Sequence, residues 1–133
     1  MILTLAEQAV ESPALMEIKS VDAAQPFITK DGSEIRELLA HRNSAVRNQS
    51  LAEATLDPGQ ATERHYHAQA EEIYYVVEGS GEMELDGDRR TVSPGDAVLI
   101  PPGAWHQIRA GERRLRFLCC CAPAYRHEDT FFD

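Results

Sequence analysis

Short apolar runs alternate with turn-forming sequences along most of the chain, and this pattern predicts strands rather than helices. Glycine, proline and aspartate cluster at short intervals from about residue 26 onward, at Asp31-Gly32, Asp57-Pro58-Gly59, Gly79-Ser80-Gly81, Asp86-Gly87-Asp88, Ser93-Pro94-Gly95-Asp96 and Pro101-Pro102-Gly103. Frequent turns between short strands are typical of antiparallel sandwiches and barrels. We therefore expect a single all-β domain over residues 26–133.

Alternation within the runs predicts which residues face the core. Residues 82–86 alternate between acidic and apolar, so Met83 and Leu85 should face inward and the acids, Glu84 among them, should face water. The turn at 86–88 then predicts a hairpin into a strand at 89–92. Further strands are expected at 34–40, 49–57, 73–77, 97–100 (wholly apolar, as in a core strand) and 115–121 (with Leu115, Phe117, Cys119 and Cys121 inward).

Helical periodicity occurs only between residues 5 and 18, where Pro13 interrupts it. Residues 1–25 are expected to form an N-terminal arm, or a helical or strand extension of the domain. No positive charge precedes the apolar start of the chain, and no run reaches the roughly 18 apolar residues of a membrane helix. We therefore expect neither a targeting segment nor a membrane span.

Composition narrows the classes of partner. The chain has 133 residues, the size of one ordinary domain, and its 22 acidic and 13 basic side chains give a formal charge of −9. This balance disfavours binding to nucleic acid or to an anionic membrane surface and leaves a small molecule as the expected partner. Cys119, Cys120 and Cys121 are an odd, consecutive set that builds no disulfide framework, so we expect reduced thiols in a buried strand and a cytoplasmic protein.

Three of the five histidines lie in two segments that begin with glycine, Gly59-x5-His65-x-His67-x4-Glu72-x6-Gly79 and Gly95-x5-Pro101-x-Gly103-x2-His106. His65 and His67 are two apart on an expected strand, so both side chains leave the same face. Glu72 begins the next strand after a short connection, and His106 follows a rigid turn at the start of another. Each residue alone has ordinary structural roles, but three imidazoles and a carboxylate that converge would form a divalent-metal site.

These two segments resemble the signature motifs of the cupin superfamily. The motifs cover residues 59–79 and 95–106, with a short spacer as in small single-domain bacterial cupins (monocupins), and nine fixed positions match: Gly59, His65, His67, Glu72, Gly79, Gly95, Pro101, Gly103 and His106. The second motif often ends in Asn, where this chain has Ala110, a position that is not a ligand. The strand leading into residues 119–121 is similar to the sugar-isomerase-like group of cupins.

The resemblance implies a double-stranded β-helix, which is a jelly-roll barrel, with a metal at its centre. It also implies that His65, His67, Glu72 and His106 are the metal ligands. Three neutral imidazoles and one carboxylate suit one divalent transition metal; Fe, Mn and Zn come first on availability, and Ni, Co and Cu are also compatible. Such a centre can polarise a carbonyl, activate water or, if the metal is redox-active, activate dioxygen.

Two classes of function follow from the resemblance. The first is a metal-dependent enzyme that acts on a small oxygenated organic substrate, in a dioxygenase-like or a cyclase- or isomerase-like reaction. The second is a non-catalytic cupin that binds or senses a small molecule. Tyr74 shares a strand face with Glu72 and should enter the barrel, either as a catalytic acid, base or hydrogen-bond donor or as an aromatic side chain that fills the interior.

The pocket and its surroundings can also be anticipated. An apolar wall, suited to an aromatic, keto or enol substrate, is expected from Met83, Val98, Ile100, Ile108, Leu115 and Phe117. A basic group could neutralise a substrate carboxylate if its loop covers the barrel mouth, or could belong to an exposed loop: Arg36, His41, Arg42 and Arg47.

One strand has an apolar outer face, made by Ile73, Tyr75 and Val77. An apolar patch of this kind is seldom left in water. Small cupins usually pair, so the resemblance also implies a homodimer, in which Ile2, Leu3 and Leu5 could supply a swapped arm.

Overall fold

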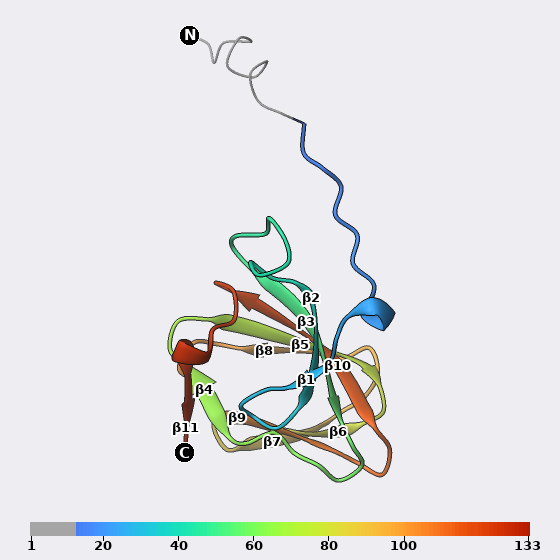
Figure 1. Ribbon diagram of the computed structural model, residues 1–133. Coiled ribbons are helices and arrows are strands. Elements are labelled where there is room, and N and C mark those ends of the chain that lie inside the picture. Colours follow the sequence, from blue (N-terminus) through green and yellow to red (C-terminus); the bar gives the residue numbers. More distant parts are fainter. Residues whose placement is uncertain (1–12) are drawn as a thin grey trace.

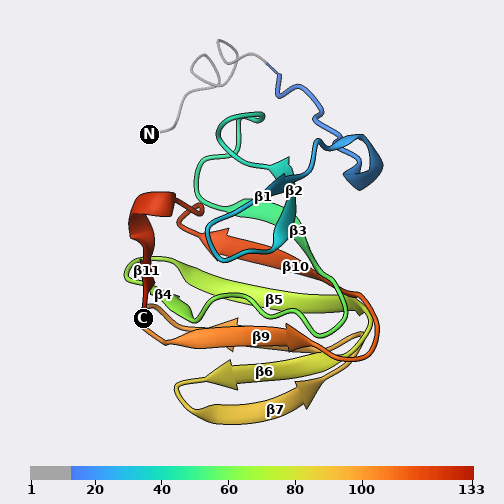
Figure 2. The same cartoon turned by 60° about the horizontal axis from the view of Figure 1, so that its bottom comes forward.

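The computed structural model describes residues 13–133 and consists mainly of two antiparallel sheets that lie face to face (Figures 1 and 2). The larger sheet has six strands, which in spatial order are β1 (Phe27–Ile28), β2 (Glu34–Leu39), β3 (Ser50–Leu56), β10 (Leu115–Ala122), β5 (Glu71–Glu78) and β8 (Ala97–Ile100). The smaller sheet has five, in the order β11 (Thr130–Phe132), β4 (His65–His67), β9 (His106–Ala110), β6 (Gly81–Leu85) and β7 (Asp88–Val92).

Neighbouring strands in both sheets are distant in the sequence. β10 lies between β3 and β5, and β4 lies between β9 and β11, so the two sheets are joined by repeated crossovers. This is the jelly-roll arrangement, and the all-β fold expected from the turn pattern is confirmed. The core lies between the sheets, where the largest fully buried side chains are Phe117, Leu56, Ile100, Ile108 and Leu115.

Each strand expected from the pattern is present. The hairpin between β6 and β7 turns at Asp86 and Gly87, both with positive φ (46° and 90°), as a two-residue hairpin turn requires. In β10 the predicted inward face is also correct: Leu115, Phe117 and Cys121 are buried, and Cys119 packs against the core.

Two expectations about burial were wrong. In β8 only Ile100 is buried, and Leu99 is 54% exposed, because β8 is the edge strand of its sheet and no other described segment covers its outer face. Glu84 was expected in water but is only 4% exposed. Its carboxylate accepts hydrogen bonds from Arg64 Nε at 2.8 Å and from the Gly87 backbone N–H at 2.7 Å. These partners compensate for the lost hydration of a buried charge.

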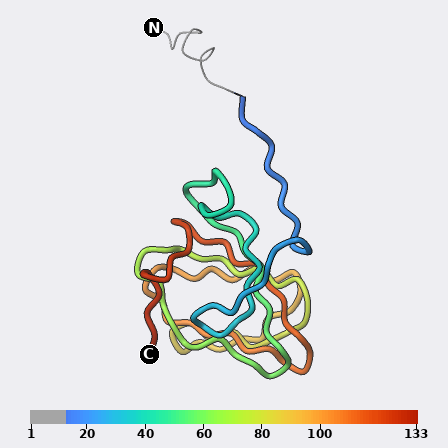
Figure 3. Tube along the Cα trace, in the orientation of Figure 1, coloured from blue at the N-terminus to red at the C-terminus, as the bar shows by residue number. Residues whose placement is uncertain are grey.

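The N-terminal region is only partly described. Residues 13–20 are extended and leave the body of the fold, and the 3₁₀ turn η1 (Val21–Ala23) precedes β1 (Figures 1 and 3). The periodic segment at 5–18 therefore forms no helix over 13–18. Its first part, residues 5–12, lies outside the described residues, and so do Ile2, Leu3 and Leu5. The boundary of the arm at residue 25 remains a prediction.

The outer face of β5 and β8 is apolar, and no segment within residues 13–133 covers it. Ile73, Tyr75, Val77 and Leu99 are all exposed there, and we call these four residues the outer patch. Among residues 13–133, no helix has the length and apolar character needed to cross a membrane.

Candidate metal centre

Three histidines from the smaller sheet meet inside the barrel. His65 and His67 lie on β4 with both side chains buried, and His106 begins β9 directly opposite His65 in the register of the two strands. One ring nitrogen from each of the three lies within 4.8 Å of the other two. The turn before β9 is held against β4, because Gly103, at φ 83°, donates its N–H to the His67 carbonyl oxygen at 2.6 Å.

The Nδ1 atom of each imidazole is hydrogen-bonded to a backbone carbonyl oxygen of the protein. Nδ1 lies 2.7 Å from the Glu63 carbonyl oxygen in His65 and 3.0 Å from the Ala104 carbonyl oxygen in His106. In His67 it lies 3.1 Å from the carbonyl oxygen of Asp129. A carbonyl oxygen only accepts, so each Nδ1 donates and each neutral ring presents the lone pair of Nε2. This is the arrangement that orients histidines as metal ligands.

Glu72, the second residue of β5, lies beside this cluster. Its Oε1 is 3.3 Å from His67 Nε2 and 3.5 Å from His106 Nε2. Both Glu72 Oε1 and His106 Nε2 are buried, and neither has a hydrogen-bond partner among the described residues. A buried polar atom without a hydrogen-bond partner costs folding free energy, so the two atoms need an explanation. A divalent cation held between these atoms would satisfy both, and the donor set of imidazole nitrogens and one carboxylate oxygen fits such an ion.

The electrostatics agree with this donor set. Burial opposes ionisation of Glu72, but the neighbouring His106 and His67 hold its pKa far below the usual range. Burial and the nearby imidazole of His106 lower the pKa of His65 to about 4. Burial disfavours the charged form of His67 as well, but the Glu72 carboxylate outweighs it and raises that pKa. The site therefore combines an ionised carboxylate with His65 in its neutral form.

The C-terminal segment completes the site from outside. η2 (His127–Asp129) and β11 lie against β4 (Figure 2). The buried Asp129 carboxylate accepts hydrogen bonds from the N–H groups of Ala68, Gln69 and Ala70 at 3.0 to 3.2 Å. These three residues connect β4 to β5, so Asp129 holds both the His67 ring and the loop that leads to Glu72.

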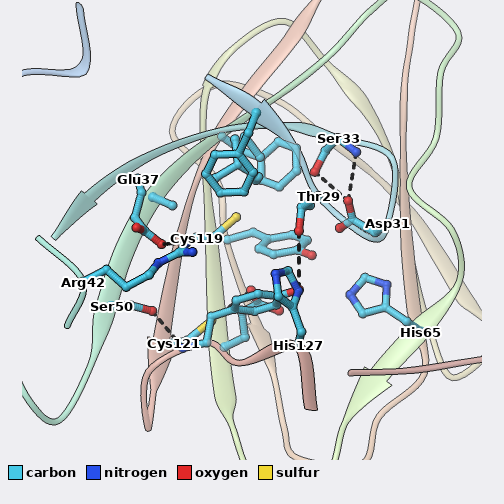
Figure 4. A pocket seen from close by; sticks show the side chains of 18 residues that line it. Thr29, Asp31, Ser33, Glu37, Arg42, Ser50, His65, Cys119, Cys121 and His127 are labelled. Atoms are coloured by element: carbon cyan, nitrogen blue, oxygen red, sulfur yellow. Dashed lines mark hydrogen bonds and ion pairs between the residues drawn. The ribbon is translucent and has the colours of Figure 1, made fainter. Parts of the chain in front are cut away.

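A cavity between the sheets leads to the centre. His65 and Glu72 belong to its lining, together with Phe117, Cys119 and Cys121. Of the six residues expected to form an apolar wall, only Phe117 lines this cavity, because the other five pack into the core elsewhere or, in the case of Val98, beside it. The wall is nevertheless mainly apolar, through Phe27, Ile35, Ala52, Ala54 and Tyr74 in addition to Phe117. It also carries more polar side chains than expected, from Thr29, Asp31, Ser33, Glu37, Arg42, Ser50, Tyr125 and His127 (Figure 4).

Tyr74 enters the barrel as its alternation with Glu72 predicts. Its ring is buried and packs against Phe117 and His106, at centroid distances of 4.7 and 5.9 Å. Burial raises its pKa well above the ordinary value, so the side chain is a neutral phenol. Its catalytic role remains a prediction.

One residue of the basic group reaches the cavity. Arg42 lines it and pairs through Nη2 with Glu37 Oε2 at 2.8 Å. Arg36 instead donates to the carbonyl oxygens of Val21 and Ala24, away from the lining. His41 and Arg47 are exposed and do not belong to the lining.

Two polar features of the cavity were missed by the motif search. Asp31, in the turn between β1 and β2, accepts hydrogen bonds at Oδ1 from the Ser33 N–H at 2.9 Å and from the Ser33 hydroxyl at 2.6 Å. The Tyr125 hydroxyl lies 3.0 Å from Nδ1 of His127. Figure 4 shows Asp31 and His65 on one side of the cavity and Glu37 and Arg42 on the other.

The fold and the site together define the family. Residues 52–121 match the family model of the cupin domain. The chain therefore belongs to the cupin family, as a small single-domain member, and the resemblance noted in its two motifs is confirmed.

Individual relatives agree with this assignment. The chain is 48% identical over 110 residues to an uncharacterised protein of Methanocaldococcus jannaschii, a match that covers 82% of this chain and 88% of the relative. It is 28% identical over 112 residues to the polyketide synthase CurC of Streptomyces cyaneus, covering 84% of this chain and 70% of the relative. Oxalate decarboxylase from Bacillus subtilis superimposes with a TM-score of 0.76 at 25% identity, over 92% of this chain and 33% of that chain. Relatives of this chain therefore include proteins named as enzymes.

Proposed function

We propose that this protein is a metal-dependent enzyme that acts on a small oxygenated organic molecule in the barrel cavity. The observation that supports it is the pair of buried, unpartnered atoms, Glu72 Oε1 and His106 Nε2, beside two further imidazoles whose Nδ1 atoms already donate to the backbone. His65, His67, Glu72 and His106 would hold one divalent transition metal, Fe, Mn or Zn in the first instance. The bound ion would supply a Lewis acid for a substrate oxygen.

The polar side chains in the mainly apolar cavity favour a reaction in which protons move, of the cyclase or isomerase kind. Oδ1 of Asp31 accepts both hydrogen bonds from Ser33, and Oδ2 takes part in neither. Oδ2 is therefore suited to accept a proton from a substrate and return it. Tyr125 and His127 form a second pair that can exchange a proton. Tyr74, as a neutral phenol, is suited to donate a hydrogen bond to a substrate oxygen.

The names of two relatives support an enzyme rather than a binding module. CurC is named as a polyketide synthase, and the Bacillus subtilis neighbour as a decarboxylase. Both names denote chemistry on small oxygenated molecules.

Metal loading is the first test. The full-length chain is purified with Fe(II), Mn(II) or Zn(II), and bound metal per chain is measured by mass spectrometry. We expect about one ion per chain, the loss of that ion in His67→Gln, and its retention in His41→Gln, which changes an exposed histidine in the same way. A wild-type chain with only trace metal would contradict the proposal.

The second test separates the reaction classes. Hydroxyacetone in D₂O serves as the probe for proton abstraction, followed by loss of its C–H signals in the proton NMR spectrum. We expect metal-dependent exchange that falls about 100-fold in Asp31→Asn, with no change in Asp57→Asn. Dioxygen uptake with catechol or a flavonol would place the protein among the dioxygenase-like cupins instead. A metal-loaded chain inactive in both assays would favour the binding or sensing alternative.

A further inference from the structure

Cys121 makes a direct contact with the carboxylate of the candidate centre. Its Sγ lies 3.2 Å from Glu72 Oε2, and both side chains are buried. The two residues are register partners on the adjacent strands β10 and β5. Because their side chains leave the same face of the sheet at the same level, the pairing of the strands itself brings the thiol to the carboxylate.

The contact is a hydrogen bond with a defined direction. An ionised carboxylate has no proton to give, so the thiol donates and Oε2 accepts. Burial and the charge of Glu72 raise the pKa of Cys121, which agrees with a thiol that keeps its proton. The two oxygens of Glu72 therefore have different surroundings. Oε2 accepts from Cys121, whereas Oε1 lies beside His67 and His106 and has no hydrogen-bond partner within residues 13–133.

We propose that Cys121 is a positioning residue that fixes the Glu72 carboxylate so that Oε1 alone is offered to the metal. The inference rests on the proposed metal-dependent function. A carboxylate held through one oxygen occupies one coordination position and leaves the others to substrate. Without the thiol, the Glu72 side chain can rotate and both oxygens become available to the ion.

A purely structural role for Cys121 would be the filling of space in the sheet interior. Substitutions separate the two roles, because Cys121→Ser keeps a donor and Cys121→Val fills the space without one. Cys120→Val is the matched control, since it makes the same change on the opposite face of the same strand, where the side chain is half-buried.

The experiment measures metal affinity on the full-length chain. Zn(II) dissociation constants are obtained by competition with a chelator, and the visible spectrum of the Co(II)-loaded protein reports the coordination number. We expect Cys121→Val to weaken Zn(II) binding 10- to 100-fold, the range typical of a lost partner behind a metal ligand. The same variant should show weaker Co(II) absorption bands, as a higher coordination number produces. Cys121→Ser and Cys120→Val should stay close to wild type.

The possible failures are distinguishable. Wild-type affinity and an unchanged Co(II) spectrum in Cys121→Val would overturn the inference and leave the proposed function standing. A loss of affinity in Cys121→Ser equal to that in Cys121→Val would also overturn it, since space and not the donor would then matter. A wild-type chain that binds neither ion would overturn the proposed function and this inference with it. Should Cys121→Val fail to fold, Cys121→Ala removes the same donor without adding bulk.

Discussion

Removal of the Asp129 carboxylate tests how the C-terminal segment stabilises the candidate metal centre. Asp129→Ala deletes the acceptor for three backbone N–H groups, of which that of Ala70 is buried and those of Ala68 and Gln69 are partly buried. The buried group loses its partner outright, at a cost of about 1–3 kcal/mol, whereas water can reach the other two, which cost about 0.5–1.5 kcal/mol each. We therefore expect a loss of about 2–6 kcal/mol in the free energy of unfolding.

Two variants calibrate this expectation. Asp129→Asn keeps one carbonyl acceptor and should lose about half as much stability. Glu128→Ala changes the neighbouring exposed acid of the same 3₁₀ turn and should be neutral. Urea unfolding of the metal-free chain, followed by circular dichroism, gives all three values with a common slope.

The same variants should show coupled effects on metal binding. Asp129 supports the loop between His67 and Glu72, and its carbonyl oxygen accepts from the His67 ring. Asp129→Ala should therefore weaken Zn(II) binding about tenfold. A free energy of unfolding within about 0.5 kcal/mol of wild type, the range of ordinary surface substitutions, would refute this account of the segment.

Three further predictions concern the rest of the barrel. Gly79→Ala should destabilise the fold by about 3 kcal/mol or more, because its φ of 76° is strained and a Cβ there would meet the Arg114 carbonyl oxygen. Gly95→Ala should cost only about 1–2 kcal/mol, since its φ of 95° is strained but the space around it is open. Equal losses of stability in thermal denaturation would contradict this. Arg64 holds the pKa of Glu84 below its ordinary 4.5, so Glu84→Gln should destabilise the fold at neutral pH. The difference should shrink as the pH falls below 4.5 and vanish below the lowered pKa of the folded state; a difference that stays unchanged from about pH 7 to about pH 3 would argue against the ion pair. We also propose that two copies of the chain pair through the outer patch. Gel filtration should then show a dimer, and Val77→Glu should convert it to a monomer. A wild-type monomer of 14.8 kDa would exclude this pairing.

The histidine cluster was predictable because its signals are local. His65 and His67 alternate on one strand, and the turn at Pro101 and Gly103 fixes where His106 begins the next. Strand alternation then sends all three rings inward. Glu72 followed from the same logic, and the structure places it beside His67 and His106.

The residues missed by sequence reasoning reach the cavity through pairing over long distances along the chain. Asp129 acts on Ala68 and Ala70 only because β11 pairs with β4. Cys121 meets Glu72 only in the observed register of β10 and β5. No spacing rule connects such residues, and the polar groups of the cavity were therefore not predicted.

Glu84 illustrates a second limit. Alternation assigned it to solvent, and a buried charge is rare enough to make that assignment reasonable. Its burial depends on Arg64, 20 residues away, which supplies the compensating cation. Arg64 and Glu84 come together only because β4 and β6 both lie beside β9 in the folded sheet.

The contact between His67 and Asp129 also has a consequence for biosynthesis. The two residues are separated by 62 positions, so His67 leaves the ribosome long before the residue that fixes the orientation of its ring. A nascent chain cannot complete the pocket until β11 has emerged and paired with β4. Metal uptake is therefore expected to follow closure of the barrel and to fail in chains truncated before residue 127.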